Sequence, residues 1–281
     1  MMKQGQSSIT AIILTYNEEV NLRKCLTSIA GLVSEIIVVD SGSTDKTKEI
    51  AEKFSAKFVV HPFKNQAEQF NWALLNTNPQ GEWIMRLDAD EELLPELKKE
   101  IAEKLPTLEA GVNGVILRRR TYFLGKWMRH GGIYPTKQLR IFRRGKGMSE
   151  EREMDEHLIL NEGRAVEFDN DFIDDNRKPL REWFAKHRGY AKREARTYWK
   201  ERNADSADVP EGQAGERRRS KKIYYSFPPF IRAFVFFLYR YIVKLGFLDG
   251  AKGFLFAVLQ VLWYRSLVDT EILRARSSAG N

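Results

Sequence analysis

Along the first third of the chain, short apolar runs alternate with longer segments in which apolar and polar residues are mixed. Short apolar runs, typical of buried strands, occupy residues 9–14, 35–39, 58–60 and 83–87. In the segments between them, apolar residues recur every three or four positions, as on one face of a helix. Strands that alternate with helices predict a parallel sheet with right-handed crossover connections.

The helical segments differ in how regular their apolar faces are. Leu22, Leu26 and Ile29 define the face of the first, and Ile50 with Phe54 that of the second. A third helix is expected from Phe70, Trp72 and Leu74, whose spacing is less regular.

Polar clusters follow three of the four strand-like runs: TYNEE at 15–19, DSGSTD at 40–45 and DADEE at 88–92. Ligands of a parallel sheet bind outside the carboxyl ends of its strands, so these clusters predict one shared site. Asp40 can accept hydrogen bonds from a base N–H or a ribose hydroxyl, and Gly42 allows the backbone to approach a ligand closely.

The DADEE cluster places four acids within five residues of a chain whose net charge is +8. Like charges this close repel one another, which predicts a positive partner. Asp88 and Asp90 lie two apart on an extended segment, point to the same side and could share a hard divalent cation. An isolated Asp-x-Asp pair more often marks a solvated strand end, but the joint placement of the three clusters shifts the balance toward the metal.

The composition limits the classes of protein to which the chain can belong. A chain of 281 residues with 43% hydrophobic residues can form one large core, or a domain with an appendage. The lone Cys25 excludes an internal disulfide, and no signal-like segment precedes the first strand, so a reducing cytoplasmic location is expected. The basic net charge indicates an anionic partner, which leaves nucleic acid, a membrane surface or a phosphorylated substrate open.

The N-terminal part of the chain, to about residue 120, resembles the family 2 glycosyltransferases of the GT-A fold. The resemblance rests on ILTYNEEVNLRKCLTSI, IIVVDSGSTDKT, NQAEQFNWAL and WIMRLDADEEL, and continues less sharply through GGIYPTKQLRIFRRGKG, MDEHL, DDNRKPLREWFAKHRGYAKREA and GFLDGAKGF. These later segments are similar to bacterial enzymes of lipopolysaccharide-core and surface-polysaccharide assembly. The implied fold is α/β, a Rossmann-like nucleotide-sugar-binding domain with a mostly parallel central sheet and a C-terminal amphipathic helical extension.

The resemblance implies a donor site and a metal site. Its donor-binding residues would be Leu14, Tyr16, Glu18, Asp40, Asn71 and Asp88. The first three would cup the base, Asp40 would contact the uracil or ribose, and Asn71 would border the nucleotide. Asp88 and Asp90 would hold Mg²⁺ or Mn²⁺ on the diphosphate, where the metal stabilises the leaving group.

Enzymes of this family that invert the sugar carbon need a base that deprotonates the acceptor hydroxyl. The segment EREMDEHL offers Asp155 and Glu156. Glu156 is favoured because many relatives have His-Glu where this chain has Asp155-Glu156, and the absent His leaves the choice open. A surface acidic turn is the alternative, and His157 is expected to be a structural or acceptor-site residue.

The segment KQLRIFRRGKG alternates polar and apolar residues and predicts a strand that carries Arg140 and Arg143. One of them is a candidate to meet a diphosphate of the donor or of a lipid-linked acceptor, and a solvated basic edge strand is the alternative. Before it, Trp127 belongs either to a sugar-stacking loop or to the core.

Four segments are expected: a GT-A catalytic domain at 1–177, a helix packed on that domain at 178–203, a flexible linker with the basic cluster RRRSKK at 204–222, and a helical membrane-interface segment at 223–281. The helix is predicted from an apolar and aromatic stripe at helical spacing, and the linker from its polar composition.

The last segment is apolar but interrupted. Arg232, Arg240 and Lys244 break its first part, which falls short of the roughly 20 apolar residues that a membrane span requires, and the stretch 253–264 is shorter still. Two helices lying in the membrane interface are predicted, and each nearby basic residue would contribute about 1 kcal/mol of attraction to anionic lipid. A helical hairpin buried against the catalytic domain or a dimer partner is the alternative.

The expected protein is thus a bacterial, peripheral, inverting and metal-dependent hexosyltransferase on the cytoplasmic face of the inner membrane. It would move one sugar from a UDP-sugar to a lipid-linked glycan in lipopolysaccharide or surface-polysaccharide biosynthesis. A polyprenyl-phosphate sugar transferase and a non-catalytic, membrane-tethered nucleotide-sugar-binding protein remain alternatives. A processive synthase is not expected without a Gln-x-x-Arg-Trp motif, and no nucleic-acid-binding motif accompanies the basic residues.

Overall fold

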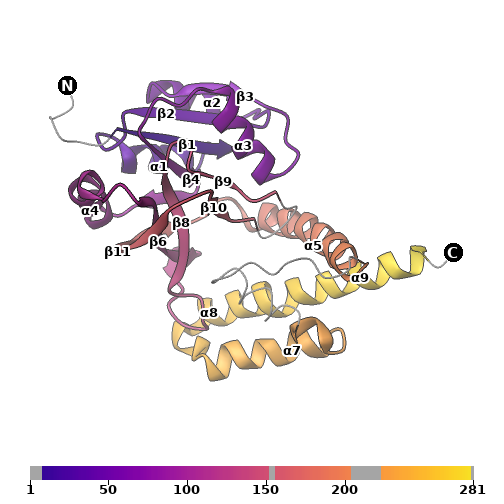
Figure 1. Cartoon of the computed structure of the whole chain (residues 1–281). Coiled ribbons are helices and arrows are strands. Elements are labelled where there is room, and N and C mark those ends of the chain that lie inside the picture. Colours follow the sequence, from indigo (N-terminus) through magenta and orange to yellow (C-terminus); the bar gives the residue numbers. More distant parts are fainter. Residues whose placement is uncertain (1–7, 152–155, 204–222, 280–281) are drawn as a thin grey trace. The chain divides into compact units, whose positions relative to one another are not determined.

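The computed structural model describes residues 8–151, 156–203 and 223–279, and the chain divides into two compact units (Figure 1). Unit 1 consists of Met1–Trp127 and Pro135–Lys178. Unit 2 consists of Met128–Tyr134 and Pro179–Asn281. The predicted linker 204–222, with its basic cluster, lies outside the described residues.

Unit 1 contains all the strands of the described chain: β1 (Ile9–Thr15), β2 (Glu35–Asp40), β3 (Lys57–Val60), β4 (Trp83–Asp88), β5 (Glu91–Leu93), β6 (Val112–Phe123), β7 (Lys126–Trp127), β8 (Thr136–Arg143), β9 (Gly147–Ser149), β10 (Leu158–Leu160) and β11 (Arg164–Asp174). Its helices are α1 (Leu22–Ile29), α2 (Thr47–Lys53), α3 (Gln66–Asn76), α4 (Pro95–Lys104) and the 3₁₀ turn η1 (Leu105–Thr107). The four strands and three helices predicted from hydrophobic periodicity are confirmed.

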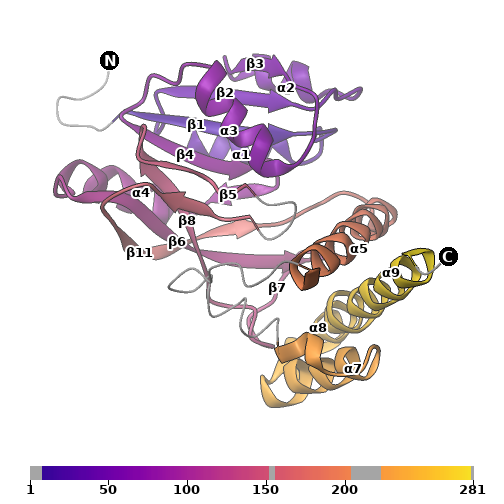
Figure 2. The same ribbon diagram turned by 45° about the vertical axis from the view of Figure 1, so that its right-hand side comes forward.

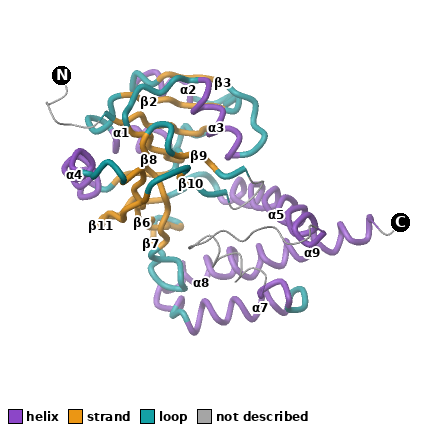
Figure 3. The backbone as a smooth tube through the Cα atoms, in the orientation of Figure 1, coloured by secondary structure: helices purple, strands orange, loops and turns teal. Residues whose placement is uncertain are grey.

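The main sheet has the strand order β3-β2-β1-β4-β8-β6-β11-β5, with β7 paired to β6. The first four predicted strands are parallel to one another, whereas β8 runs antiparallel to both β4 and β6. The sheet is therefore mixed rather than wholly parallel. A separate hairpin, β9 with β10, accompanies it (Figure 3).

The pleat of β1 places successive side chains in two different cores. Ile9, Ala11 and Ile13 face the core that α1, α2 and α4 complete, whereas Ile12 faces the core that α3 and β10 complete. A strand buried on both faces reads as a continuous apolar run, which is why the sequence alone identified it. The helices on both faces leave the carboxyl ends of β1, β2 and β4 as the position for a site.

The described residues of unit 2 form helices joined by short turns, together with the segment Met128–Tyr134 (Figure 2). Its elements are α5 (Leu180–Asn203), α7 (Ile231–Leu238), the π-helix η2 (Tyr239–Val243), the 3₁₀ turn η3 (Gly246–Asp249), α8 (Gly250–Ala257), the π-helix η4 (Val258–Trp263) and α9 (Tyr264–Ala279).

The predicted helix at 178–203 is present as α5, and its buried face packs against α9 of the same unit. Small residues of α5, Ala191 and Ala195, meet Val268 and Ile272 of α9. Buried Glu194 reinforces this contact, because it accepts hydrogen bonds from both Tyr225 and Tyr264 and from Arg265. Packing of α5 on the catalytic domain remains a prediction.

The run from η3 to α9 is longer than the sequence led us to expect. Gly246–Arg276 is one helix of 31 residues, and its most apolar window has a mean hydropathy of 1.3 with 28% of the window buried. In the described parts of the chain it is the one helix long and apolar enough to cross a membrane. Length and composition alone do not distinguish a span from an apolar helix that packs on protein.

Candidate active site

The three polar clusters meet at the carboxyl edge of the parallel strands. Thr15 of β1 is in register with Asp40 of β2, and Leu14 is in register with Asp88 of β4. With a strand spacing of about 4.8 Å, Asp40 and Asp88 end about 10 Å apart on either side of β1. The shared edge predicted from the sequence is therefore present, with β1 between the two acids.

Asp40 shapes the loop that follows β2. Its carboxylate accepts hydrogen bonds from the backbone of Gly42 at 2.8 Å, from the backbone of Ser43 at 2.6 Å and from the hydroxyls of Ser43 and of Thr15. Gly42 has φ +93°, a conformation that glycine adopts without a steric penalty. Because both oxygens are occupied, Asp40 acts on this edge chiefly through the loop that it holds.

Lys178, to which the sequence analysis gave no role, binds the TYNEE segment. Its ammonium donates to the Glu18 carboxylate at 2.5 Å and to the backbone oxygen of Tyr16 at 3.0 Å. Burial raises the pKa of Glu18, and the nearby Lys178 opposes that rise. The Tyr16 ring itself is 57% exposed, which leaves it accessible to a planar ligand.

Two buried arginines face Asp88. Arg86 Nη2 lies 3.9 Å from one carboxylate oxygen, and Arg140 Nη2 lies 3.9 Å from the other. Arg140 also donates a short hydrogen bond to Glu91, which in turn accepts the Asp88 backbone N–H at 2.9 Å. The positive partner expected for the DADEE acids is thus supplied in part by the protein itself.

Glu91 is one of the two acids of this cluster to which the sequence gave no role. It is 2% exposed, and burial raises its pKa to about 8 against the opposing charge of Arg140, with Asp88 adding to the rise. Arg140 was a candidate for a diphosphate contact, but the structure engages its guanidinium with Glu91. A contact between Arg140 and a phosphate would have to compete with that ion pair.

Glu156 reaches the same cluster from the loop between β9 and β10. Its carboxylate lies 3.9 Å from Arg86 Nη2, so Arg86 lies between Glu156 and Asp88. The His157 backbone oxygen accepts the Glu150 N–H at 2.8 Å, which extends the hairpin pairing toward this loop. Asp155, the alternative base, lies outside the described residues.

Asn71 of α3 fixes the hairpin that carries Glu156. Its side-chain amide donates to the Ser149 backbone oxygen and accepts from the Ser149 N–H, both at 2.8 Å. This bidentate contact uses one donor and one acceptor of the amide. Asn71, predicted to border the nucleotide, is therefore also a clamp on β9.

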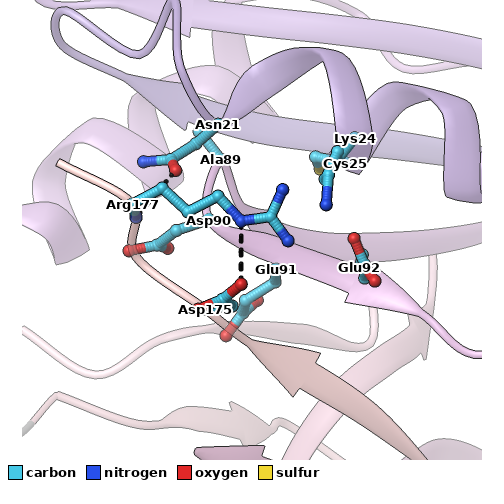
Figure 4. A pocket seen from close by; sticks show the side chains of 9 residues that line it. All are labelled: Asn21, Lys24, Cys25, Ala89, Asp90, Glu91, Glu92, Asp175 and Arg177. Atoms are coloured by element: carbon cyan, nitrogen blue, oxygen red, sulfur yellow. Dashed lines mark hydrogen bonds and ion pairs between the residues drawn. The ribbon is translucent and has the colours of Figure 1, made fainter. Parts of the chain in front are cut away.

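Asp90 differs from Asp88 because its carboxylate has no hydrogen bond or ion pair with a residue in the described parts of the chain. It borders the open pocket shown in Figure 4, whose volume, counted with its mouth, is about 200 Å³. The pocket is lined by Asn21, Lys24, Cys25, Ala89, Asp90, Glu91, Glu92, Asp175 and Arg177. Arg177 is held there by Asp175 at 2.8 Å, which leaves Asp90 available for another cation.

Arg143 lies away from this edge. It is in register with Trp83, the first residue of β4, whereas Asp88 is the last. Its guanidinium pairs with Glu82 and lies over the Trp83 ring at 4.4 Å. The structure therefore does not bring Arg143 to the predicted phosphate site, because the antiparallel register of β8 directs it to the opposite end of the sheet.

The donor atoms at the edge suit a hard divalent cation. No group of three or more His, Cys, Asp or Glu side chains is placed to hold a metal within residues 8–151, 156–203 and 223–279. A cation such as Mg²⁺ usually takes only one or two protein carboxylates and completes its shell with substrate phosphates and water. Asp90, with Asp88 beside it, meets that requirement for ligand type.

Residues 10–158, more than half of the chain, match the family model described as glycosyl transferase family 2. This chain belongs to glycosyltransferase family 2. The GT-A type of fold predicted from the sequence is confirmed, with a mixed, mostly parallel sheet flanked by helices and a C-terminal helix.

Several known proteins are similar to this family member. An uncharacterized glycosyltransferase of Rickettsia bellii is 44% identical over 93 residues, which cover 33% of this chain and 31% of the relative. The lipopolysaccharide core biosynthesis glycosyltransferase LpsC of Rhizobium meliloti is 31% identical over 165 residues, 56% of this chain and 58% of LpsC. Neither match spans two thirds of the relative.

Among solved structures, glucosyl-3-phosphoglycerate synthase of Mycobacterium tuberculosis, in complex with Mn²⁺, UDP and glucosyl-3-phosphoglycerate, is 25% identical. The match covers 41% of this chain and 44% of that protein, with a TM-score of 0.34.

Proposed function

We propose that this protein is an inverting glycosyltransferase that moves one sugar from a UDP-sugar to a lipid-linked glycan acceptor. The observation that carries the proposal is the convergence of Asp88, Asp90 and Glu156 at one edge of the sheet. Donor-side carboxylates and a candidate base are brought together there by Arg86 and by the β9–β10 hairpin.

On the donor side, Tyr16 and Leu14 provide a ring and an apolar side chain for the base, and the loop held by Asp40 borders them. Asp90, with Asp88, would hold Mg²⁺ or Mn²⁺. When bound, the cation would stabilise the charge on the departing nucleoside diphosphate. Asp88, Asp90 and Glu156 bring carboxylates together at this edge, and the carboxylate of Asp90 has no ion pair in the described parts of the chain, which favours a cation as its partner.

On the acceptor side, Glu156 takes the proton of the attacking hydroxyl while the bond between the sugar and the diphosphate breaks. Arg86 is 4% exposed and lies against Glu156, so it favours the ionised carboxylate that a base requires. Arg86 therefore positions the base rather than touching the reacting atoms.

The acceptor class follows from unit 2 and from the relatives. Of the twenty-two large hydrophobic side chains exposed in the described residues, fourteen lie between residues 223 and 255. They form what we call the apolar segment: Ile223, Phe227, Phe230, Ile231, Phe234, Val235, Tyr239, Ile242, Val243, Leu245, Phe247, Leu248, Phe254 and Leu255. Such concentrated exposure suits attachment to an anionic membrane surface that carries the acceptor, and LpsC is named for lipopolysaccharide core biosynthesis.

Titration calorimetry of UDP, GDP and UDP-sugars into the purified chain, with and without Mn²⁺, tests the donor site. We expect UDP species to bind tightly only when metal is present. Equal binding in metal-chelated buffer would contradict the role given to Asp90. Failure of every nucleotide to bind a folded protein would overturn the glycosyltransferase proposal.

A further inference from the structure

The charged residues of the apolar segment are arranged for an anionic partner. Between residues 223 and 255 the sole acid is Asp249, which is buried and accepts hydrogen bonds from the His130 backbone and ring at 2.9 Å. Arg232 is buried as well and pairs with Asp269. Lys244 remains exposed, so the charge that this segment presents is positive.

Arg240 is the unusual residue of this group because it is largely buried without a carboxylate partner. In the described part of the chain its guanidinium makes one hydrogen bond, from Nε to the backbone oxygen of Gly131 at 2.6 Å. Burial lowers its pKa to about 10, and the like charge of Arg265 adds to this. An arginine has five N–H donors, so four of them are left for another group.

Arg240 also borders a pocket in unit 2. The pocket is lined by Met128, His130, Gly131, Ile133, Arg240, Gly246, Asp249, Gly253, Phe256, Ala257 and Val261. Counted with its open mouth, it encloses about 270 Å³.

Glycines let the backbone form the wall of this pocket. Gly131 has φ +70° and donates its N–H to the Lys244 backbone oxygen at 2.8 Å. A Cβ on Gly246 would lie 2.9 Å from the Arg240 backbone oxygen, so no larger side chain fits there without a shift. The wall beside Arg240 is thus built in part from main chain, and apolar side chains such as Ile133 and Val261 complete the lining.

We propose that Arg240 binds the phosphate group of a membrane lipid whose acyl chains lie along the apolar segment. A guanidinium matches phosphate through two parallel hydrogen bonds, and a phosphate would compensate a cation that has no acid of its own. Apolar and basic side chains in one segment suit a bilayer, which offers both acyl chains and anionic headgroups. The inference rests on the membrane attachment in the proposed function and adds a specific lipid site to it.

The test measures binding of the full chain to vesicles of zwitterionic lipid that contain a minor share of phosphatidic acid. Arg240→Gln should weaken binding about 20-fold or more, since it removes charged hydrogen bonds as well as a charge. Lys244→Gln removes an exposed charge from the same segment and should cost about fivefold. The loss of binding for Arg240→Lys should fall between these two values, because lysine keeps the charge but lacks the two parallel N–H donors of a guanidinium.

Circular dichroism and thermal unfolding of all three variants establish that they remain folded. If Arg240→Gln and Lys244→Gln weaken binding equally, Arg240 contributes charge alone and the lipid site is wrong. If the unmodified chain binds no vesicle of any composition, the membrane part of the proposed function fails instead, which is a separate result.

Two further measurements identify the source of the phosphate. Inorganic phosphate should neither bind the chain tightly nor displace it from the vesicles; competition at low concentration would assign the pocket to a free anion and overturn the proposal. Sedimentation in the absence of lipid should show no dimer that depends on Arg240, because such a dimer would mean that a second copy covers this surface.

Discussion

At the scale of single residues, the two acids of the Asp-x-Asp pair have different surroundings. Asp88 is flanked by Arg86 and Arg140, whereas the Asp90 carboxylate has no ion pair in the described parts of the chain. A carboxylate already placed between two guanidiniums has less negative charge to offer a metal. We therefore propose that Asp90 is the principal metal ligand and that Asp88 helps to shape the edge of the site.

Asp90→Asn tests this division. The amide keeps the size of the side chain and removes the charge, so UDP binding in the presence of Mn²⁺ should weaken by about 100-fold. Binding of UDP without metal should stay the same, which serves as the internal control. An unchanged metal-linked affinity in titration calorimetry would show that the cation is held elsewhere.

Arg86→Met tests the role of the arginine that lies between Asp88 on the donor side and Glu156 on the acceptor side. Loss of the guanidinium removes the buried counter-charge that faces Glu156 and one of the two that face Asp88, which should lower the free energy of unfolding by about 3 kcal/mol and reduce kcat. Arg86→Lys should recover part of both losses. A variant with normal kcat in steady-state assays would show that Arg86 has no part in positioning Glu156.

At the scale of the elements, the site depends on contacts between segments far apart in sequence. The β9–β10 hairpin reaches the sheet edge because Asn71 of α3 binds Ser149, 78 residues away along the chain. The sequence indicated Asn71 as a nucleotide neighbour, whereas the structure gives it a second, architectural role. The two roles predict different kinetic defects.

Asn71→Ala separates these roles. If Asn71 acts as a clamp, kcat should fall about 10-fold or more, since the base would be misplaced, while the dissociation constant of UDP stays unchanged. If it borders the nucleotide, UDP binding should weaken first. Asn76→Ala is the control, because Asn76 lies on the same helix, is exposed and bonds only within it.

Glu100 joins α4 to β11 and makes stability depend on pH. Burial acts to raise its pKa, but hydrogen bonds from the backbones of Asp169 and Asn170 and from Lys104 outweigh this and lower the pKa to about 2. Because the folded pKa is below the unfolded value of 4.5, the stabilisation is present above pH 4.5 and lost as pH falls through about 2.

Glu100→Gln should therefore be less stable than the unmodified chain at neutral pH, with the difference shrinking as the pH approaches 2. Chemical denaturation at a series of pH values measures this difference. Glu103→Gln, an exposed neighbour on the same helix, should leave the pH dependence unchanged. A difference that is constant with pH would show that the carboxylate of Glu100 is not specially stabilised.

At the scale of the whole molecule, the sequence predicted the strands and site residues that local patterns of residues encode. The strands β1, β2 and β4 were recognisable as continuous apolar runs because most of their residues are buried on both faces, and the shared edge for the site followed from parallel topology. The roles of Arg140 and Arg143 were not recognisable, because they depend on the register of β8 against β4, more than 50 residues apart in the chain. Arg86 and Lys178 were missed for the same reason: each acts through a partner that only the fold supplies.

The proposed attachment to a membrane needs variants outside the catalytic unit. Phe234→Asp and Ile242→Asp each place a charge in the apolar segment at side chains about half exposed, 52% and 54%. If these side chains enter lipid, each variant should weaken vesicle binding by about 10-fold or more. UDP binding, which depends on residues of unit 1, should remain unchanged. Leu75→Asp makes the same change at an exposed residue of α3 and should leave vesicle binding intact, so equal losses in all three variants would mean that added negative charge alone, and not the apolar segment, governs attachment.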